Sequence, residues 1–167
     1  MGSEMCIRDS LEFVQFSNIA SPGMTPQNMW DLHCKIEELL ARDDVAGVVV
    51  THGTDTLEET SFFLDITAKS QKPVVCTAAM RGASDISPDG PYNIYCSVKT
   101  AASPQAVGMG VMVCLDEILQ APGEVMKTHS ANPATFQSPW WGPIGYVDID
   151  HIVWRRKVLG VKRFHPQ

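Results

Sequence analysis

The chain has 167 residues, 44% of them hydrophobic, and this size and composition are typical of one globular domain with a substantial buried core. Its formal net charge is −6, and the first cluster of basic residues is Arg155-Arg156-Lys157, so the charge pattern predicts no nucleic-acid partner. No apolar stretch is long enough to cross a bilayer, which predicts that the chain has no membrane partner.

Residues 1–10, MGSEMCIRDS, match neither a targeting segment nor the patterned chain that follows. We expect them to be a non-native leader and leave them out of the fold prediction. If the native N-terminus is missing, any export signal is missing with it, so a periplasmic location stays open as an alternative.

The cysteines favour a reducing compartment. There are five, none in a CxxC pair, and three of them, Cys76, Cys96 and Cys114, lie in apolar runs. We interpret these three as small buried apolar residues of a cytoplasmic protein, with disulfides as the less favoured alternative.

The first elements lie before residue 45. An apolar stretch within 11–20 is compatible with a short strand, and Ser21-Pro22-Gly23 is a turn. Thr25 before Pro26 predicts an N-cap followed by proline in the first helical position. Apolar residues then recur at helical spacing to about Arg42: Met29, Leu32, Ile36, Leu39 and Leu40.

Strands and helices alternate from residue 45 onward. Residues 45–51 have no polar alternation, as expected for a strand buried on both faces of a parallel sheet. After the polar break 52–55, Thr56 and Glu59 fit a capping box that opens a helix to about Ser70. The same reasoning predicts strands at 73–79 and 107–115 around a polar loop at 80–91 and a helix at 93–103. Later we expect short strands at 118–120, 124–128 and 152–154, with a loop at 133–145. This alternation predicts a layered α/β domain with a mostly parallel sheet.

A candidate site lies at 51–56, at the carboxyl end of a predicted strand, where ligands bind in α/β sheets. It offers hydroxyls, a carboxylate and the amides of a helix N-terminus, which favour negative charge. Gly53 would let the backbone approach a ligand closely. The alternative is a well-capped helix start, since Thr and Asp are the residues that caps require. Local spacing leaves both interpretations open.

The string GVVVTHGTDTLEET (47–60) closely resembles the second signature of the bacterial asparaginase/glutaminase family. The resemblance covers nearly all of 14–157 in the expected order, through KPVV (72–75), AMR (79–81), DGPYN (89–93), VMKT (125–128), ATF (134–136) and GPIGY (142–146). It implies a three-layer α/β/α fold, flavodoxin- or Rossmann-like. In this reading 11–157 is the larger N-terminal domain, lacking its first strand and the C-terminal domain, and 158–167 begins an interdomain linker.

The family's site residues are then expected at matching positions. Thr54, Asp55 and Lys127 match a Thr–Asp–Lys group, and Ser21 matches a serine that holds the substrate α-carboxylate. A threonine hydroxyl needs a base or a nearby positive charge, which Lys127 would supply. Asp55 would orient the lysine and suits an α-ammonium group. Without the resemblance, Lys127 would be interpreted as a surface lysine.

The sequence departs from the family pattern in two ways. Many family members carry a glutamine at the position of Pro22, and that glutamine binds the amino-acid head group of the substrate. Pro22 therefore leaves open whether the protein prefers asparagine or glutamine as its substrate. The Gly-rich strand end that bears another threonine, usually assigned as the acylated nucleophile, is absent. Thr54 is therefore either a base-activated partner or the nucleophile of one half-reaction. The expected substrate-binding set is Ser21, Pro22, Gly53, Thr54 and Asp55.

The resemblance implies an amidohydrolase that converts L-asparagine to L-aspartate and ammonia, with L-glutamine and D-asparagine as further candidate substrates. No metal or organic cofactor is required, and the histidines show no paired metal-ligand spacing. The full-length parent is expected to be a homo-oligomer, a dimer of dimers. We expect the 167 residues alone to be inactive and to aggregate.

Two alternative functions stay open. One is an ammonia-supplying domain of a tRNA-dependent amidotransferase, and the other is a non-catalytic α/β domain.

Two further features have alternatives of their own. Arg81 either binds a carboxylate or holds the 80–91 loop, and Trp140-Trp141 is interpreted as packing or a subunit contact.

Overall fold

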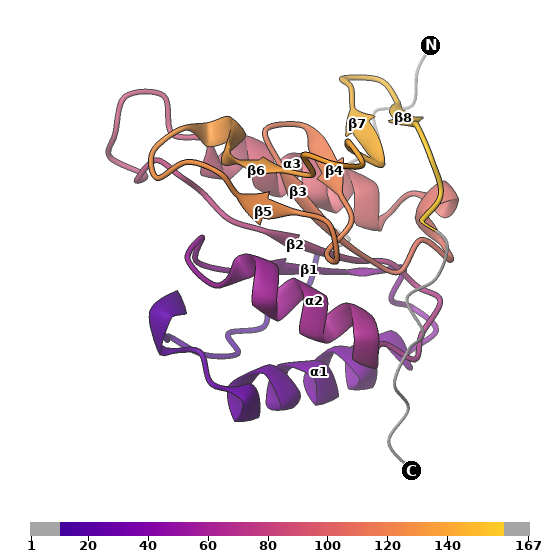
Figure 1. The fold of residues 1–167 in the computed structure, drawn as a ribbon. Helices are drawn as coiled ribbons and strands as arrows, with labels where there is room; N and C mark the ends of the chain where they lie inside the picture. The colour runs from indigo at the N-terminus through magenta and orange to yellow at the C-terminus, as the bar shows by residue number, and fades with distance from the viewer. Residues whose placement is uncertain (1–10, 159–167) are drawn as a thin grey trace.

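The computed structural model describes residues 11–158, and the predicted leader and all but the first residue of the predicted linker lie outside this range. At its centre is a mixed sheet with the strand order β1-β2-β3-β4-β7-β8 (Figure 1). Its parallel part consists of β1 (Val48–Thr51), β2 (Val74–Thr77) and β3 (Val111–Leu115). The shorter strands β4 (Ile118–Gln120), β7 (Gly145–Val147) and β8 (Ile152–Trp154) extend it in antiparallel fashion.

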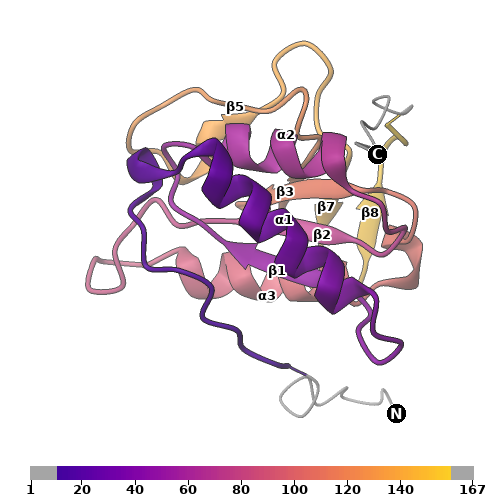
Figure 2. The same ribbon diagram turned by 90° about the horizontal axis from the view of Figure 1, so that it is seen from below.

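Helices cover both faces of this sheet. Helices α1 (Pro26–Leu40) and α2 (Leu57–Thr67) lie on one face, and α3 (Gly90–Ala101) lies on the other (Figures 1 and 2). Alternating side chains of β2 divide between the two cores: Val74 and Cys76 pack with α1 and α2, whereas Val75 packs with α3. Successive strand residues point to opposite faces, so a strand covered on both sides must be apolar throughout. The predicted three-layer α/β/α fold is confirmed.

The two strand–helix–strand crossovers have opposite hands. The strands β1, β2 and β3 are adjacent, parallel and in chain order, yet α2 and α3 lie on opposite faces. When two successive crossovers move in the same direction across a sheet, they have the same handedness only if their helices lie on the same face of the sheet. One of them is therefore left-handed, although about 98% of such connections are right-handed.

The predicted start of α1 is confirmed. The Oγ1 atom of Thr25 accepts a hydrogen bond from the backbone N–H of Asn28, and Pro26 occupies the first turn. Thr56 is the N-cap residue of α2, but the predicted capping box is wrong. The Thr56 hydroxyl donates instead to the backbone oxygen of Ser21 at 2.7 Å, so it links two segments rather than capping a helix.

Several other expectations differ from the structure, among them the strand predicted at 107–115, which begins only at Val111. No strand forms within 11–20; this segment is irregular and Phe13 is 89% exposed, because no neighbouring strand pairs with it. Helix α3 begins at Gly90 rather than 93, since Pro91 is tolerated in a first turn. The predicted loop 133–145 contains the 3₁₀ turn Pro133–Thr135 and the strand β6 (Phe136–Gln137), and β7 begins at its end.

Strand β6 pairs with β5 (Met126–Lys127) in a separate two-stranded sheet. The predicted strand at 124–128 is thus confirmed in two of its residues. The β3–β4 hairpin turns through Asp116 and Glu117, whose φ values are 51° and 65°. Positive φ at both central residues is the geometry of a type I′ turn, which matches the twist of the flanking strands.

The expected burial of Cys76, Cys96 and Cys114 is confirmed, whereas Cys34 is exposed. Burial raises the pKa of the Cys76 thiol to about 12, and that of Cys114 likewise to about 12. Cys6 lies outside the described residues. Within 11–158, none of the helices is both long and apolar enough to span a bilayer.

Candidate active site

The candidate loop emerges where β1 ends. The backbone N–H of His52 donates to the backbone oxygen of Thr77, which continues the β1–β2 ladder one residue past Thr51. The chain then turns through Gly53, Thr54 and Asp55 into α2. The strand end and the helix start therefore fix both ends of a short polar loop, as the sequence predicts.

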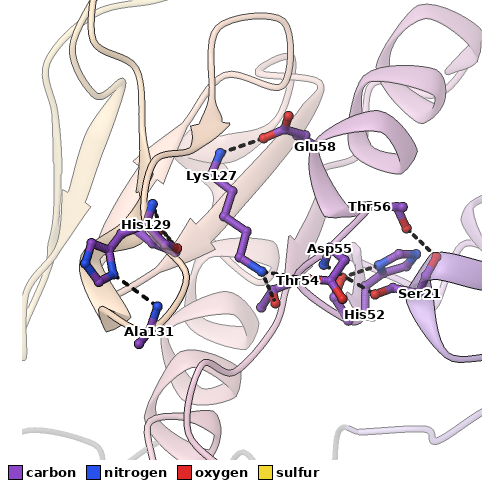
Figure 3. A network of polar contacts seen from close by, with 11 residues as sticks. Ser21, His52, Thr54, Asp55, Thr56, Glu58, Lys127, His129 and Ala131 are labelled. Atoms are coloured by element: carbon purple, nitrogen blue, oxygen red, sulfur yellow. Dashed lines mark hydrogen bonds and ion pairs between the residues drawn. The ribbon is translucent and has the colours of Figure 1, made fainter.

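Lys127 reaches this loop from β5. Its Nζ atom donates to Thr54 Oγ1 at 2.9 Å and to Asp55 Oδ1 at 2.7 Å (Figure 3). Thr54 and Lys127 are 73 residues apart in the sequence. The Lys127 side chain is 22% exposed and that of Asp55 is 58% exposed. The structure thus brings together the three residues of the predicted Thr–Asp–Lys group.

Ser21 packs against the same loop from the 3₁₀ turn Ser21–Gly23. Its Oγ atom accepts a hydrogen bond from the backbone N–H of Asp55 at 3.3 Å, and its backbone oxygen accepts from Thr56. A Cβ atom on Gly53 would lie 2.7 Å from Ser21 Cβ, so only glycine fits at this position without a shift. Pro22 occupies the same turn and is exposed.

His52, Thr60 and Glu58 also support the loop, although their places in the sequence predict no such role. The Nδ1 atom of His52 lies 2.8 Å from the backbone oxygen of Gly53, and Nε2 lies 3.2 Å from Thr60 Oγ1. Both contacts are satisfied when Nδ1 carries the proton and Nε2 accepts from Thr60. Glu58 accepts a hydrogen bond from the backbone N–H of Lys127 at 2.6 Å. The only signal in the sequence was their position inside the 47–60 string.

A cavity of about 530 Å³ lies further along the sheet edge and is lined in part by Arg81, Tyr92 and Asp116. Thr54, Asp55 and Lys127 are not among its lining residues, so we place the candidate site by side-chain geometry rather than by cavity size. Arg81 donates to the backbone oxygen of Ser87 at 3.1 Å, which favours its loop-holding role.

Asp89 secures the start of the same loop. Its carboxylate accepts from the backbone N–H groups of Met80 and Arg81 and from the amide of Asn93. Partial burial raises the pKa of Asp89, but the backbone donors outweigh this effect and leave the pKa below its usual value.

Within the described residues, no three His, Cys, Asp or Glu side chains are grouped as metal ligands would be.

The Thr54–Asp55–Lys127 group is suited to activating a hydroxyl. A neutral lysine amine within hydrogen-bond distance of a threonine hydroxyl can remove its proton, which turns a weak nucleophile into a strong one. The neighbouring carboxylate orients the amine and stabilises it once it is protonated. A Coulomb pair this exposed adds only about 0.2–1 kcal/mol to stability. The arrangement therefore matters more for chemistry than for folding.

Comparisons with known proteins identify the family of the chain. The sequence model of the family described as "Asparaginase, N-terminal" matches residues 4–159. The chain is 44% identical over 136 residues to L-asparaginase 2 of Bacillus subtilis (strain 168), covering 81% of the chain and 36% of that relative. It is 39% identical over 142 residues to a glutaminase-asparaginase of Pseudomonas fluorescens biotype A, covering 85% of the chain and 39% of that relative.

A solved structure, that of a probable cytoplasmic L-asparaginase from Campylobacter jejuni, superposes with a TM-score of 0.89 at 40% identity. The match covers 96% of this chain and 52% of that one. The chain thus spans less than half the length of the two curated relatives. Sequence, fold and the extent of these matches lead to one conclusion: the chain belongs to the asparaginase family and represents that family's N-terminal domain.

Proposed function

We propose that the protein containing this chain is an amidohydrolase that converts L-asparagine to L-aspartate and ammonia. The observation that carries the proposal is the contact of the Lys127 amine with the Thr54 hydroxyl and the Asp55 carboxylate. Relatives named as L-asparaginases, at about 40% identity, support the substrate class.

In the proposed reaction, Lys127 accepts the proton of the Thr54 hydroxyl as a carbon–oxygen bond forms at the side-chain amide carbon. The protonated Lys127 amine then gives this proton to the amide nitrogen, the carbon–nitrogen bond breaks and ammonia leaves. Water attacks the resulting ester, one of its protons returns to the oxygen of the attacking hydroxyl, and aspartate is released. Thr54 takes one of two roles: it attacks the amide itself, or it relays the proton of another attacking hydroxyl or of water. In both roles the amine must be neutral before the proton moves.

The α-amino and α-carboxylate groups of the substrate have complementary partners at the loop. Asp55 supplies negative charge for the ammonium group. The Ser21 Oγ atom accepts from Asp55 N, so its own proton is available to a substrate oxygen. Gly53 keeps Ser21 close to the loop, and Pro22 contributes shape but no side-chain hydrogen bond. A relative named as a glutaminase-asparaginase makes L-glutamine the first competing substrate to test, followed by D-asparagine.

Oligomeric state, cofactor requirement and location are proposed from the family resemblance and from the cysteines. We propose a homo-oligomer, a dimer of dimers, for the full-length protein, and hydrolysis that requires no metal or organic cofactor. A cytoplasmic location is supported by the buried free thiols and by the likeness to the Campylobacter jejuni protein, which is described as a probable cytoplasmic L-asparaginase.

Ammonia release by the full-length protein tests the proposal. Incubation with L-asparagine should release ammonia and aspartate in equal amounts, and chelator treatment should leave the rate unchanged. Mass spectrometry of acid-quenched protein should show whether an aspartyl ester accumulates on Thr54, which separates its two roles. Absence of ammonia release from L-asparagine, L-glutamine and D-asparagine would refute the proposed function.

A further inference from the structure

Lys127 is held at both of its ends by one short segment. Its amine contacts Thr54 and Asp55, while its backbone N–H donates to the Glu58 carboxylate at 2.6 Å (Figure 3). The three partners lie within five consecutive residues, 54–58, which join the loop to the first turn of α2. The start of α2 thus sets the position of both the lysine backbone and the lysine amine.

The strand that carries Lys127 is attached mainly within its own short hairpin. Strand β5 contains two residues and pairs only with β6, which is equally short, within the described residues. Neighbouring Val125 and Phe136 are buried in the core beneath α2, and Thr128 donates to the backbone oxygen of Thr135. A hydrogen bond from a backbone N–H to an ionised carboxylate is about twice as strong as one between neutral groups. The Glu58 contact is a direct hydrogen bond from the Lys127 backbone to the first turn of α2, and it holds the lysine backbone against that helix.

We propose that Glu58 is a positioning residue for the reaction, acting through Lys127 and not touching the substrate. The role rests on the proposed function, since it matters only if the Lys127 amine takes a proton from Thr54. Proton transfer requires the donor and acceptor at hydrogen-bond distance, about 2.6–3.2 Å. A misplacement of about 1 Å can cost on the order of 10²-fold in rate. Fixing the backbone at the root of a four-carbon side chain limits how far its amine can drift.

If Glu58 only stabilised the start of helix α2, its removal would have a different effect. Glu58 and Glu59 both lie in the first turn of α2, where negative charge interacts favourably with the helix dipole. Glu59 is exposed, and the Lys127 backbone donates to Glu58 instead, so Glu59 shares the dipole effect but not the contact with Lys127. Glu59→Ala is therefore the matched control for Glu58→Ala.

Steady-state kinetics of the full-length protein separate these roles. We expect Glu58→Ala to lower kcat by about tenfold or more with KM within about twofold, because the loss is in positioning a catalytic group rather than in binding. Glu58→Gln should recover most of kcat, since its amide oxygen still accepts from Lys127 N. Glu59→Ala should match the unmodified protein. A kcat of Glu58→Ala close to that of Glu59→Ala, or no recovery by Glu58→Gln, would overturn the proposal.

A second measurement does not depend on activity. Hydrogen exchange at the Lys127 amide and acylation of its amine, both read by mass spectrometry, should be faster in Glu58→Ala than in Glu58→Gln or Glu59→Ala. If the unmodified full-length protein releases no ammonia, the proposed function fails by itself, and these two rates still report whether Glu58 fixes Lys127. Equal rates in all three variants would refute the positioning role even in an active enzyme.

Discussion

Gly53 and Ser21 approach so closely that a Cβ atom placed on Gly53 would lie 2.5 Å from the Oγ atom of Ser21. The loop after β1 and the 3₁₀ turn at Ser21 therefore form one unit, further joined by the bonds from Asp55 N and Thr56 Oγ1 to Ser21. The packing between these two residues sets the distance between the proposed carboxylate-binding and ammonium-binding groups.

We expect Gly53→Ala to weaken substrate binding, because the added methyl group must push Ser21 away from Asp55. KM for L-asparagine should rise by about tenfold or more, the scale for losing a good substrate contact. Gly123→Ala is the matched control, since its Cβ would meet Phe62 at an ordinary 3.5 Å. A KM for Gly53→Ala equal to that of the control would show that Ser21 does not contact the substrate.

Removing either partner of the Lys127–Thr54 contact should affect rate far more than stability. Thr54→Val and Lys127→Met should each lower kcat by at least about 10²-fold, the scale for losing a positioned catalytic group. The free energy of unfolding should change by only about 1 kcal/mol, the scale of one hydrogen bond for Thr54→Val and of the exposed Lys127–Asp55 ion pair for Lys127→Met. Lys35→Met, which breaks the exposed pair with Glu38, serves as the control for kcat. Near-normal turnover in either site variant would contradict the assigned roles.

Thiol labelling should distinguish the described cysteines by burial. At pH 8 the thiols of Cys76 and Cys114, whose pKa values burial raises to about 12, carry almost no thiolate and are shielded from reagent. Exposed Cys34 should react within minutes with an excess of a disulfide reagent. Peptide mapping of the native protein, with a denatured sample as reference, assigns each label. Rapid modification of Cys76 or Cys114 before unfolding would be inconsistent with the described core.

Asp89→Asn should destabilise the protein in a pH-dependent way. Because the folded-state pKa of Asp89 lies below its usual value, the carboxylate contributes stability above the unfolded pKa of about 3.9. That contribution is lost as pH falls through the lower folded-state pKa. The variant should therefore lose about 1 kcal/mol at pH 7 and lie closer to the unmodified protein at about pH 3.

Urea unfolding at both pH values measures this difference. Asp43→Asn, at an exposed position in the loop after α1, is the control and should show no such convergence. A gap between Asp89→Asn and the unmodified protein that stays constant between the two pH values would contradict the role given to the Asp89 carboxylate.

Local patterns in the sequence were enough to predict a layered α/β domain, whereas the three-layer α/β/α arrangement was expected from the family resemblance. Thr25 followed by Pro26 locates the start of α1, because capping involves only residues within one turn. The uninterrupted apolar run at Val74, Val75 and Cys76 predicts a strand covered on both faces, and the structure divides these residues between the two cores as that requires. Each of these predictions depends on chemistry within a few residues of chain.

Such local patterns could not predict the contacts between segments that are distant in the sequence. Nothing near Lys127 in the sequence indicates that its amine reaches Thr54, and only the family resemblance suggested the pair. Thr56 fits a cap by spacing, yet Ser21 competes for its hydroxyl from another part of the chain. Strand β6 is two residues long within a Pro- and Gly-rich segment, which is too short for any periodicity to show.

The opposite hands of the two crossovers make the chain diverge at the ends of β1 and β2, where the loop that carries Thr54 begins. The chain leaving β1 turns toward the α2 face, and the chain leaving the adjacent β2 turns toward the α3 face. In most α/β sheets such a divergence arises only where the strand order reverses. Here one reversed handedness produces the divergence between two strands that are adjacent both in the sheet and along the chain, so the chain after β1 separates from the chain after β2 without any reversal of strand order.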